Sequence, residues 1–155
     1  MEDLLKLSIE KVMNELLADP DSIIYGELNR GIEKSVENNI TPIDYYYFLK
    51  LSDGARCGAI DIWSYEELPS HQFRVSDFSG GHEKWIEVGQ VLFEPLVIHK
   101  ESEAVYLYQS EQLLKVADNF EEFILTFAFG DKYEELIPDS YFDEWFLLLK
   151  RLDLA

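Results

Sequence analysis

The chain is poor in residues that supply covalent cross-links and metal ligands. Cys57 is the one cysteine among 155 residues, which excludes an intramolecular disulfide. Its neighbours in sequence offer no partner base of the kind that marks a nucleophilic thiol, so a small buried side chain is expected. The three histidines, His71, His82 and His99, lack the H-E-x-x-H spacing of a zinc site.

Long hydrophobic runs are also absent. No stretch approaches the roughly 20 apolar residues that a membrane-spanning helix needs. The first ten residues, MEDLLKLSIE, open with acids rather than with the basic region of a signal peptide. We therefore expect no membrane partner and a reduced, cytoplasmic location.

Positive charge is scarce. Thirteen lysines and arginines stand against 31 acids, a formal net charge of −18, and residues 101–145 alone hold 12 acids and two bases. Nucleic-acid and anionic membrane surfaces are disfavoured as partners, because both are recognised through Lys and Arg. A basic protein partner is favoured, since such a field attracts proteins of opposite charge. A soluble acidic protein without such a partner is the alternative.

Apolar spacing predicts helices at the N-terminal end of the chain. Leu5, Ile9, Val12 and Leu16 recur at helical intervals, which indicates an amphipathic helix over residues 2–18. A mostly polar helix is predicted over 26–38. A third helix begins at Thr41-Pro42, an N-cap followed by a residue suited to the first turn, and ends at Asp53-Gly54.

Strand signals dominate the middle of the chain. Alternation predicts a strand over 58–64, with Ile60 and Ile62 on one face and Asp61 and Trp63 on the other. Ser64 and Glu67 match a capping box for one helical turn. The remaining predictions are a long loop over 70–84, a strand over 85–89, and a hairpin that pairs 96–100 with 104–109 around an acidic loop.

Helices return at the C-terminal end. Asp118 is the predicted cap of a helix with Phe120, Phe123 and Phe127 on one side, closed by Gly130. A last helix is predicted over 140–152, with the inward side chains Phe142, Trp145, Phe146, Leu149 and Leu152. The order of elements predicts one α+β domain over residues 1–155, with a mostly antiparallel sheet and packed N- and C-terminal helices.

No catalytic arrangement stands out. The predicted loop 70–84 contains potential cation ligands in Asp77, Ser79, His82 and Glu83, and a small metal-dependent hydrolase that uses Asp77, His82 and His99 is one alternative function. There is no G-x-S-x-G elbow, and Gly80-Gly81 lacks the lysine of a phosphate loop. In so acidic a chain, paired carboxylates are typical of solvated faces. We expect no catalytic residues, no metal and no cofactor.

Three stretches together form a family pattern. They are PIDYYYFLKLSDG (42–54), GAIDIWSYEEL (58–68), and LVIHKESEAVYLYQ followed by VADNFEEFILTF (96–127). In this order and spacing they resemble the SUKH superfamily, the Smi/Knr-like domains, over about residues 25–130. The chain departs from the family in its Asp-Gly turn, where Asn-Gly is commoner, in residues 70–84, and in the added C-terminal helix, 139–152.

The resemblance implies an α+β fold and a non-enzymatic role. Bacterial members of the family are typically immunity proteins that neutralise polymorphic toxins, often nucleases, whereas fungal relatives are regulatory adaptors. An acidic surface suits a basic nuclease toxin, and an adaptor that binds several partners is the alternative.

Aromatic anchors with a charged rim are typical of protein interfaces. Core packing of the tryptophans and plain solvation of the acids are the alternatives. The predicted partner-binding residues are Trp63, Glu66, Glu67, Asp77, Glu83 and Trp85.

Overall fold

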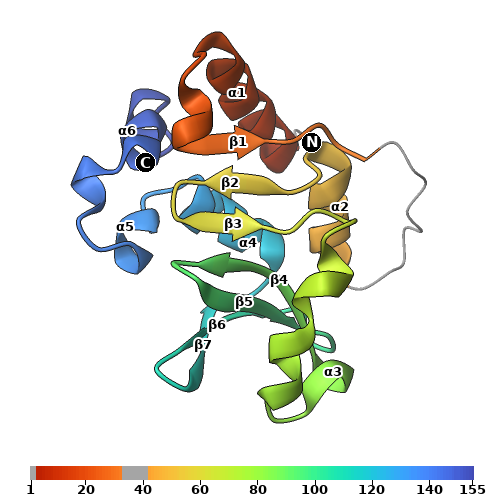
Figure 1. Ribbon diagram of the computed structural model, residues 1–155. Coiled ribbons are helices and arrows are strands. Elements are labelled where there is room, and N and C mark those ends of the chain that lie inside the picture. Colours follow the sequence, from red (N-terminus) through yellow and green to blue (C-terminus); the bar gives the residue numbers. More distant parts are fainter. Residues whose placement is uncertain (1–2, 33–41) are drawn as a thin grey trace.

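The computed structural model describes residues 3–32 and 42–155. Seven strands form one antiparallel sheet in which each strand pairs with the next one along the chain (Figure 1). Helices precede and follow this sheet, so the predicted α+β class is confirmed. The strands are β1 (Gly26–Leu28), β2 (Ala55–Cys57), β3 (Ile60–Ile62), β4 (Trp85–Val91), β5 (Glu94–His99), β6 (Val105–Gln109) and β7 (Gln112–Ala117).

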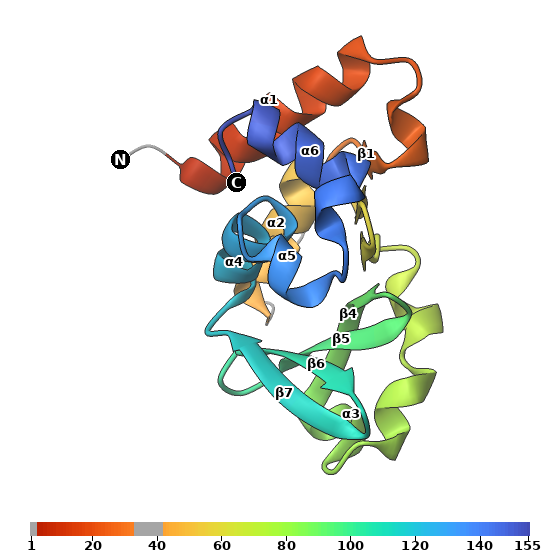
Figure 2. The ribbon, with the colours of Figure 1, turned by 90° about the vertical axis from the view of Figure 1, so that its left-hand side faces the viewer.

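The helices form two groups on opposite faces of the sheet (Figure 2). Helices α1, α2, α4 and α6 lie on one face, and the short helices η2, η3 and α3 lie on the other. The α-helices are α1 (Leu4–Ala18), α2 (Ile43–Leu51), α3 (Gly81–Lys84), α4 (Phe120–Phe123), α5 (Tyr133–Leu136) and α6 (Glu144–Arg151). The 3₁₀ turns are η1 (Ser22–Ile24), η2 (Leu68–His71), η3 (Phe73–Asp77) and η5 (Ser140–Phe142), and η4 (Ile124–Ala128) is a π-helix.

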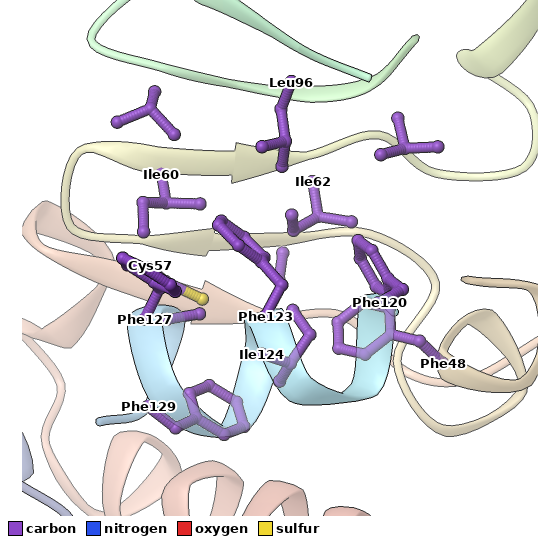
Figure 3. Close-up of a cluster of buried hydrophobic side chains, with 14 of the residues drawn as sticks. Phe48, Cys57, Ile60, Ile62, Leu96, Phe120, Phe123, Ile124, Phe127 and Phe129 are labelled. Carbon is purple, nitrogen blue, oxygen red and sulfur yellow. The ribbon is translucent and has the colours of Figure 1, made fainter. Parts of the chain in front are cut away.

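The larger core lies between the sheet and the first group of helices. Aromatic side chains of α4 and η4 fill the space beneath β2 and β3 (Figure 3). The Phe120 ring meets the rings of Tyr45 and Phe48 on α2 edge-on, at centroid distances of 5.3 and 5.5 Å. Cys57 is buried in this cluster, and burial raises the pKa of its thiol above the ordinary value. The thiol therefore behaves as a core side chain rather than as a nucleophile.

A second, smaller core lies on the opposite face of the sheet. Residues 64–84, which we call the covering segment, pack there against β4, β5 and β6. Val75 and Phe78 of this segment form a cluster with Trp85 and Val97 of the sheet. Leu96, the neighbour of Val97 on β5, belongs to the larger core. Strand β5 is therefore buried on both faces, which explains its continuous apolar run.

Three sequence predictions are confirmed. Helix α1 buries Leu5, Ile9, Val12 and Leu16 as predicted, and its N-cap Asp3 accepts a hydrogen bond from the Lys6 amide (3.1 Å). Helix α2 follows Pro42 directly, whereas the predicted cap Thr41 lies outside the described residues. The hairpin of β5 and β6 forms as predicted, but Ile98 pairs with Val105, so its loop is one residue longer than the predicted 101–103.

The helix predicted over 26–38 is wrong in its first part, because Gly26–Leu28 forms β1. A Cβ atom at Gly26 would lie 2.5 Å from the indole ring of Trp145, so the strand reaches its place only with glycine there. Residues 33–38 of the predicted helix lie outside the described residues.

Two predictions in the middle of the chain also need correction. The strand predicted over 58–64 is shorter, Ile60–Ile62, because Gly58 (φ +62°) turns the chain between β2 and β3. The stretch 70–84, predicted as a long loop, contains η3, α3 and the second half of η2. Its helical turns form because Val75 and Phe78 bury their side chains on the sheet.

The C-terminal predictions hold with shifted boundaries. Asn119, rather than Asp118, caps α4, and its Oδ1 accepts from the Glu122 amide at 2.8 Å. Phe142, predicted to point inward, is exposed, because α6 begins only after its cap Asp143. Strand β7 and helix α5 were not predicted.

We predict that Gly54→Ala destabilises the fold more than Gly81→Ala does. Both glycines have positive φ, +85° and +50°, so either alanine brings a strain of about 1–2 kcal/mol. Only at Gly54 would the new Cβ also crowd backbone atoms, with Ser64 N at 2.9 Å; nothing lies within 4 Å at Gly81. Urea denaturation of the two variants measures the difference, and equal free energies of unfolding would contradict the prediction.

Candidate binding face

The two predicted tryptophans lie inside the chain's own packing. Trp63 and Trp85 are each 8% exposed. The His71 ring stacks on the Trp63 indole at 3.7 Å, and Trp85 Nε1 donates to the carbonyl oxygen of Ser79 at 2.9 Å. Contacts within the chain thus explain why both indole rings are buried. A contact between either ring and a partner stays a prediction.

A buried ion pair fastens the covering segment to the sheet. Glu87 of β4 is fully buried, and its carboxylate receives two hydrogen bonds from Arg74, Nε to Oε1 and Nη2 to Oε2, both 2.8 Å long. Trp63 Nε1 donates a third bond to Oε2 at 2.9 Å. A buried carboxylate left without partners costs several kcal/mol, so this bidentate pair favours one position of Arg74 and of the turn that carries it.

Gln72 completes the attachment through the backbone. Its side chain donates to the carbonyl oxygen of Glu87 (2.8 Å) and accepts from the Glu87 amide (2.9 Å). Gln72 Nε2 also donates to the carbonyl oxygen of Leu68 at 2.9 Å. Gln72 therefore extends the hydrogen bonding of β4 as a further strand would, and it holds the covering segment over the β4 end of the sheet.

The covering segment stops short of the first three strands. Among the described residues, none lies as a layer on the outer face of β1, β2 and β3, which we call the open face (Figures 1 and 2). A polar row crosses it in register: Glu27 pairs with Arg56, Arg56 with Asp61, and Asp61 with Gln90. Arg56 Nε lies 3.9 Å from Asp61 Oδ1, and Gln90 Nε2 donates to Asp61 Oδ2 at 2.9 Å.

A hollow of about 280 Å³ opens on this face, between the polar row and the start of the covering segment. We call it the acidic hollow, because three carboxylates and one guanidinium give it a formal charge of −2. Its carboxylates can receive hydrogen bonds from a Lys or Arg side chain of a partner. Its main lining residues are Glu27, Asn29, Arg56, Asp61, Trp63 and Glu67.

The structure brings together two of the predicted binding residues and separates the others from them. Trp63 and Glu67 both line the acidic hollow, and Glu66 is exposed next to Glu67. Asp77 and Glu83 are exposed farther along the covering segment, at the end of η3 and in α3, and neither lines the hollow.

Sequence reasoning missed Glu27 and Arg56, and it gave Asp61 no role beyond an outward position. Strands β1 and β2, three residues each, show too little alternation to be recognised, so the register that aligns their side chains with Asp61 was not visible. One signal was present in the sequence: Asp61 alternates with the apolar Ile60 and Ile62, which indicates that its side chain lies on the outer face of the sheet.

A second hollow, of about 420 Å³, lies between η1 and α6, where Asp21, Tyr25 and Glu144 contribute to its lining. One of its acids already has partners within the chain: Asp19 accepts bonds from the Tyr25 hydroxyl (2.8 Å) and from the Asp21 amide (3.0 Å). These bonds lower the pKa of Asp19. This hollow provides a natural control for the acidic hollow.

Metal-binding chemistry finds no support in the described part of the chain, where no group of three or more His, Cys, Asp or Glu side chains is placed to hold an ion. His99 packs edge-on against Trp85, and its Nδ1 accepts bonds from the amides of Glu101 and Ser102, both 3.3 Å long. The arrangement of His99 is therefore that of a turn-forming side chain.

No model of a known protein family matches this chain, and a search of curated proteins also finds no match. Over residues 3–32 and 42–155, the helices are too short or too polar to cross a membrane.

We predict that Arg74→Met lowers the free energy of unfolding by about 3–5 kcal/mol, because it leaves the Glu87 carboxylate buried without its charge partner. Arg56→Met is the control: its pair with Asp61 is long and solvent-exposed, so the loss is about 1 kcal/mol or less. Adding Glu87→Gln to Arg74→Met should recover part of the stability. Chemical denaturation measures all three, and equal losses for Arg74→Met and Arg56→Met would contradict this account of the ion pair.

Proposed function

We propose that this protein is a non-enzymatic binding protein of the immunity type, which neutralises a basic toxin domain by occupying it with the open face. The observation that carries the proposal is the acidic hollow. It gathers Glu27 and Asp61 of the open face with Glu67 of the covering segment, at a place that the described helices leave accessible. The SUKH-like motifs and the net charge of −18 support the same reading.

The chemistry of the partner follows from this charge. A domain that cleaves nucleic acid binds phosphates through Lys and Arg, so its active surface is basic. The field of a chain with charge −18 steers such a surface toward it, and the exposed carboxylates then pair with the same side chains that would grip the substrate. Neutralisation needs no chemical step, because the toxin is blocked for as long as the complex lasts.

The first test is the capture of a partner. The tagged protein, used as bait in lysate of the organism that encodes it, should retain one stoichiometric basic protein, and the purified pair should associate faster at low ionic strength than at high. Several weakly held proteins would favour an adaptor instead. Capture of no basic protein would count against the proposal.

We predict that reversing charge in the acidic hollow slows association with that protein more than the same reversal elsewhere. Three double variants change the net charge equally: Glu27→Lys/Glu67→Lys in the acidic hollow, Asp77→Lys/Glu83→Lys on the covering segment, and Asp21→Lys/Glu144→Lys in the second hollow. All six side chains are exposed, so each variant should fold.

Surface-based kinetics across a salt series measures the effect. We expect the on-rate of the acidic-hollow variant to fall at least tenfold at low salt. The on-rates of the other two variants should fall less, by the amount that the change in net charge alone causes in all three. If the covering-segment variant shows the largest loss, the binding surface is the one that carries Asp77 and Glu83. Equal losses in all three would mean that overall charge, rather than the acidic hollow, governs association.

A further inference from the structure

The turn between β4 and β5 has an unusual composition. Leu92 and Phe93 form a two-residue turn with positive φ at both positions, +49° and +70°. Turns of this form strongly prefer Asn and Gly, because a side chain at positive φ is strained. Ser110 and Glu111 make a similar turn between β6 and β7, with φ of +52° and +62°, but with polar side chains.

The turn leaves much of the apolar surface of its two side chains exposed. Phe93 is 81% exposed and keeps most of its apolar surface in contact with water, and Leu92 is 44% exposed. Backbone strain and hydrophobic exposure thus coincide at one point of the molecule. Strain of this kind persists only where the surroundings hold the backbone in place, and it is concentrated at functional sites.

The surroundings do hold this turn. The Leu92 amide donates to the carbonyl oxygen of Ala59 (3.1 Å), and Arg74 Nη1 donates to the carbonyl oxygen of Phe93 (2.9 Å). Arg74 is itself fixed by the buried carboxylate of Glu87. Phe73, the residue before Arg74 in the chain, is 69% exposed, so the anchored Arg74 adjoins one exposed aromatic residue in sequence and another, Phe93, through a hydrogen bond.

The turn also adjoins the open face. Gln90, three residues before Phe93, donates to Asp61, which lines the acidic hollow. In protein interfaces, a hot spot is typically a rigidly held apolar side chain, and polar or charged residues surround it. The turn and the open face have this arrangement. We propose that Leu92, Phe93 and Phe73, which we call the apolar anchor, insert into an apolar pocket of the same basic protein that the open face binds.

This inference rests on the proposed function, and the charge of the chain selects the occupant. A second copy of this chain would bring its own −18 to the interface and be repelled, whereas a pocket bordered by Lys and Arg would pair with the carboxylates beside the anchor. The occupant is therefore a basic protein with an apolar pocket in its binding surface. The anchor governs how long the complex lasts, and the acidic hollow governs how fast it forms.

The test replaces each turn with the sequence that its backbone prefers. Leu92→Asn/Phe93→Gly should raise the urea midpoint, because it relieves strain, and at the same time raise the off-rate of the captured basic protein at least tenfold. Ser110→Asn/Glu111→Gly should also keep or raise the midpoint but leave the off-rate within twofold. A stabilised protein with weakened binding cannot be explained by unfolding. An off-rate within twofold of wild type for Leu92→Asn/Phe93→Gly would overturn the inference while leaving the proposed function standing.

Photo-crosslinking in the cells of the source organism supplies a direct probe. With p-benzoylphenylalanine in place of Phe93, we expect a covalent adduct with the same basic protein that the bait captures. Tyr141, an exposed aromatic residue on η5, is the matched position and should give none. An adduct between two copies of this chain, or equal adducts from both positions, would overturn the inference. Absence of any basic protein from both experiments would instead overturn the proposed function itself.

Discussion

The carboxylate of Glu87 is fully buried within the sheet, and much of the outer layer is arranged to neutralise it. An ionised carboxylate is stable there only with a charged partner and a complete set of hydrogen bonds. Arg74 supplies the charge and two of the bonds, and Trp63 supplies the third. Both donors come from outside β4, so the covering segment must return across the sheet for the fold to close. The pair also fixes geometry, because its two parallel hydrogen bonds hold the guanidinium in one direction, which a hydrophobic pair of equal volume would not do for the covering segment.

That fixed direction links the core to the surface. Arg74 Nη1, the guanidinium nitrogen that does not bond to Glu87, donates to the carbonyl oxygen of Phe93. The buried ion pair therefore also holds the strained β4–β5 turn. The covering segment, anchored by Arg74 and Gln72, occupies the face of β4, β5 and β6 and leaves the outer face of β1, β2 and β3 accessible. The acidic hollow lies beside the start of this segment. The position of a single buried carboxylate thus bears on the location of both surface features, the acidic hollow and the apolar anchor.

The sequence was informative where side chains repeat over several turns or pair around a clear loop. Helix α1, the aromatic helix α2 and the β5–β6 hairpin were predicted because their apolar spacing covers nine or more residues or two adjacent runs. Strands β1 and β2 have three residues each, too few for alternation to show, so Glu27 and Arg56, the partners of Asp61 in the polar row, were hidden. Glu87 is hidden for another reason: a lone acid in the strand WIEVG is typical of a solvated face, and its partner Arg74 lies in a stretch without periodicity.

The β4–β5 turn was missed because it contradicts local preference, and this contradiction is itself informative. Where local propensity and the folded structure disagree, natural sequences usually have a functional reason for the disagreement. Two residues at positive φ cost on the order of 1–2 kcal/mol each, and the loss is borne by a domain whose total stability is only about 5–15 kcal/mol. An Asn-Gly pair would fold the same hairpin without that cost. Leu92 and Phe93 are therefore better explained by what they present outside the molecule than by anything they do within it.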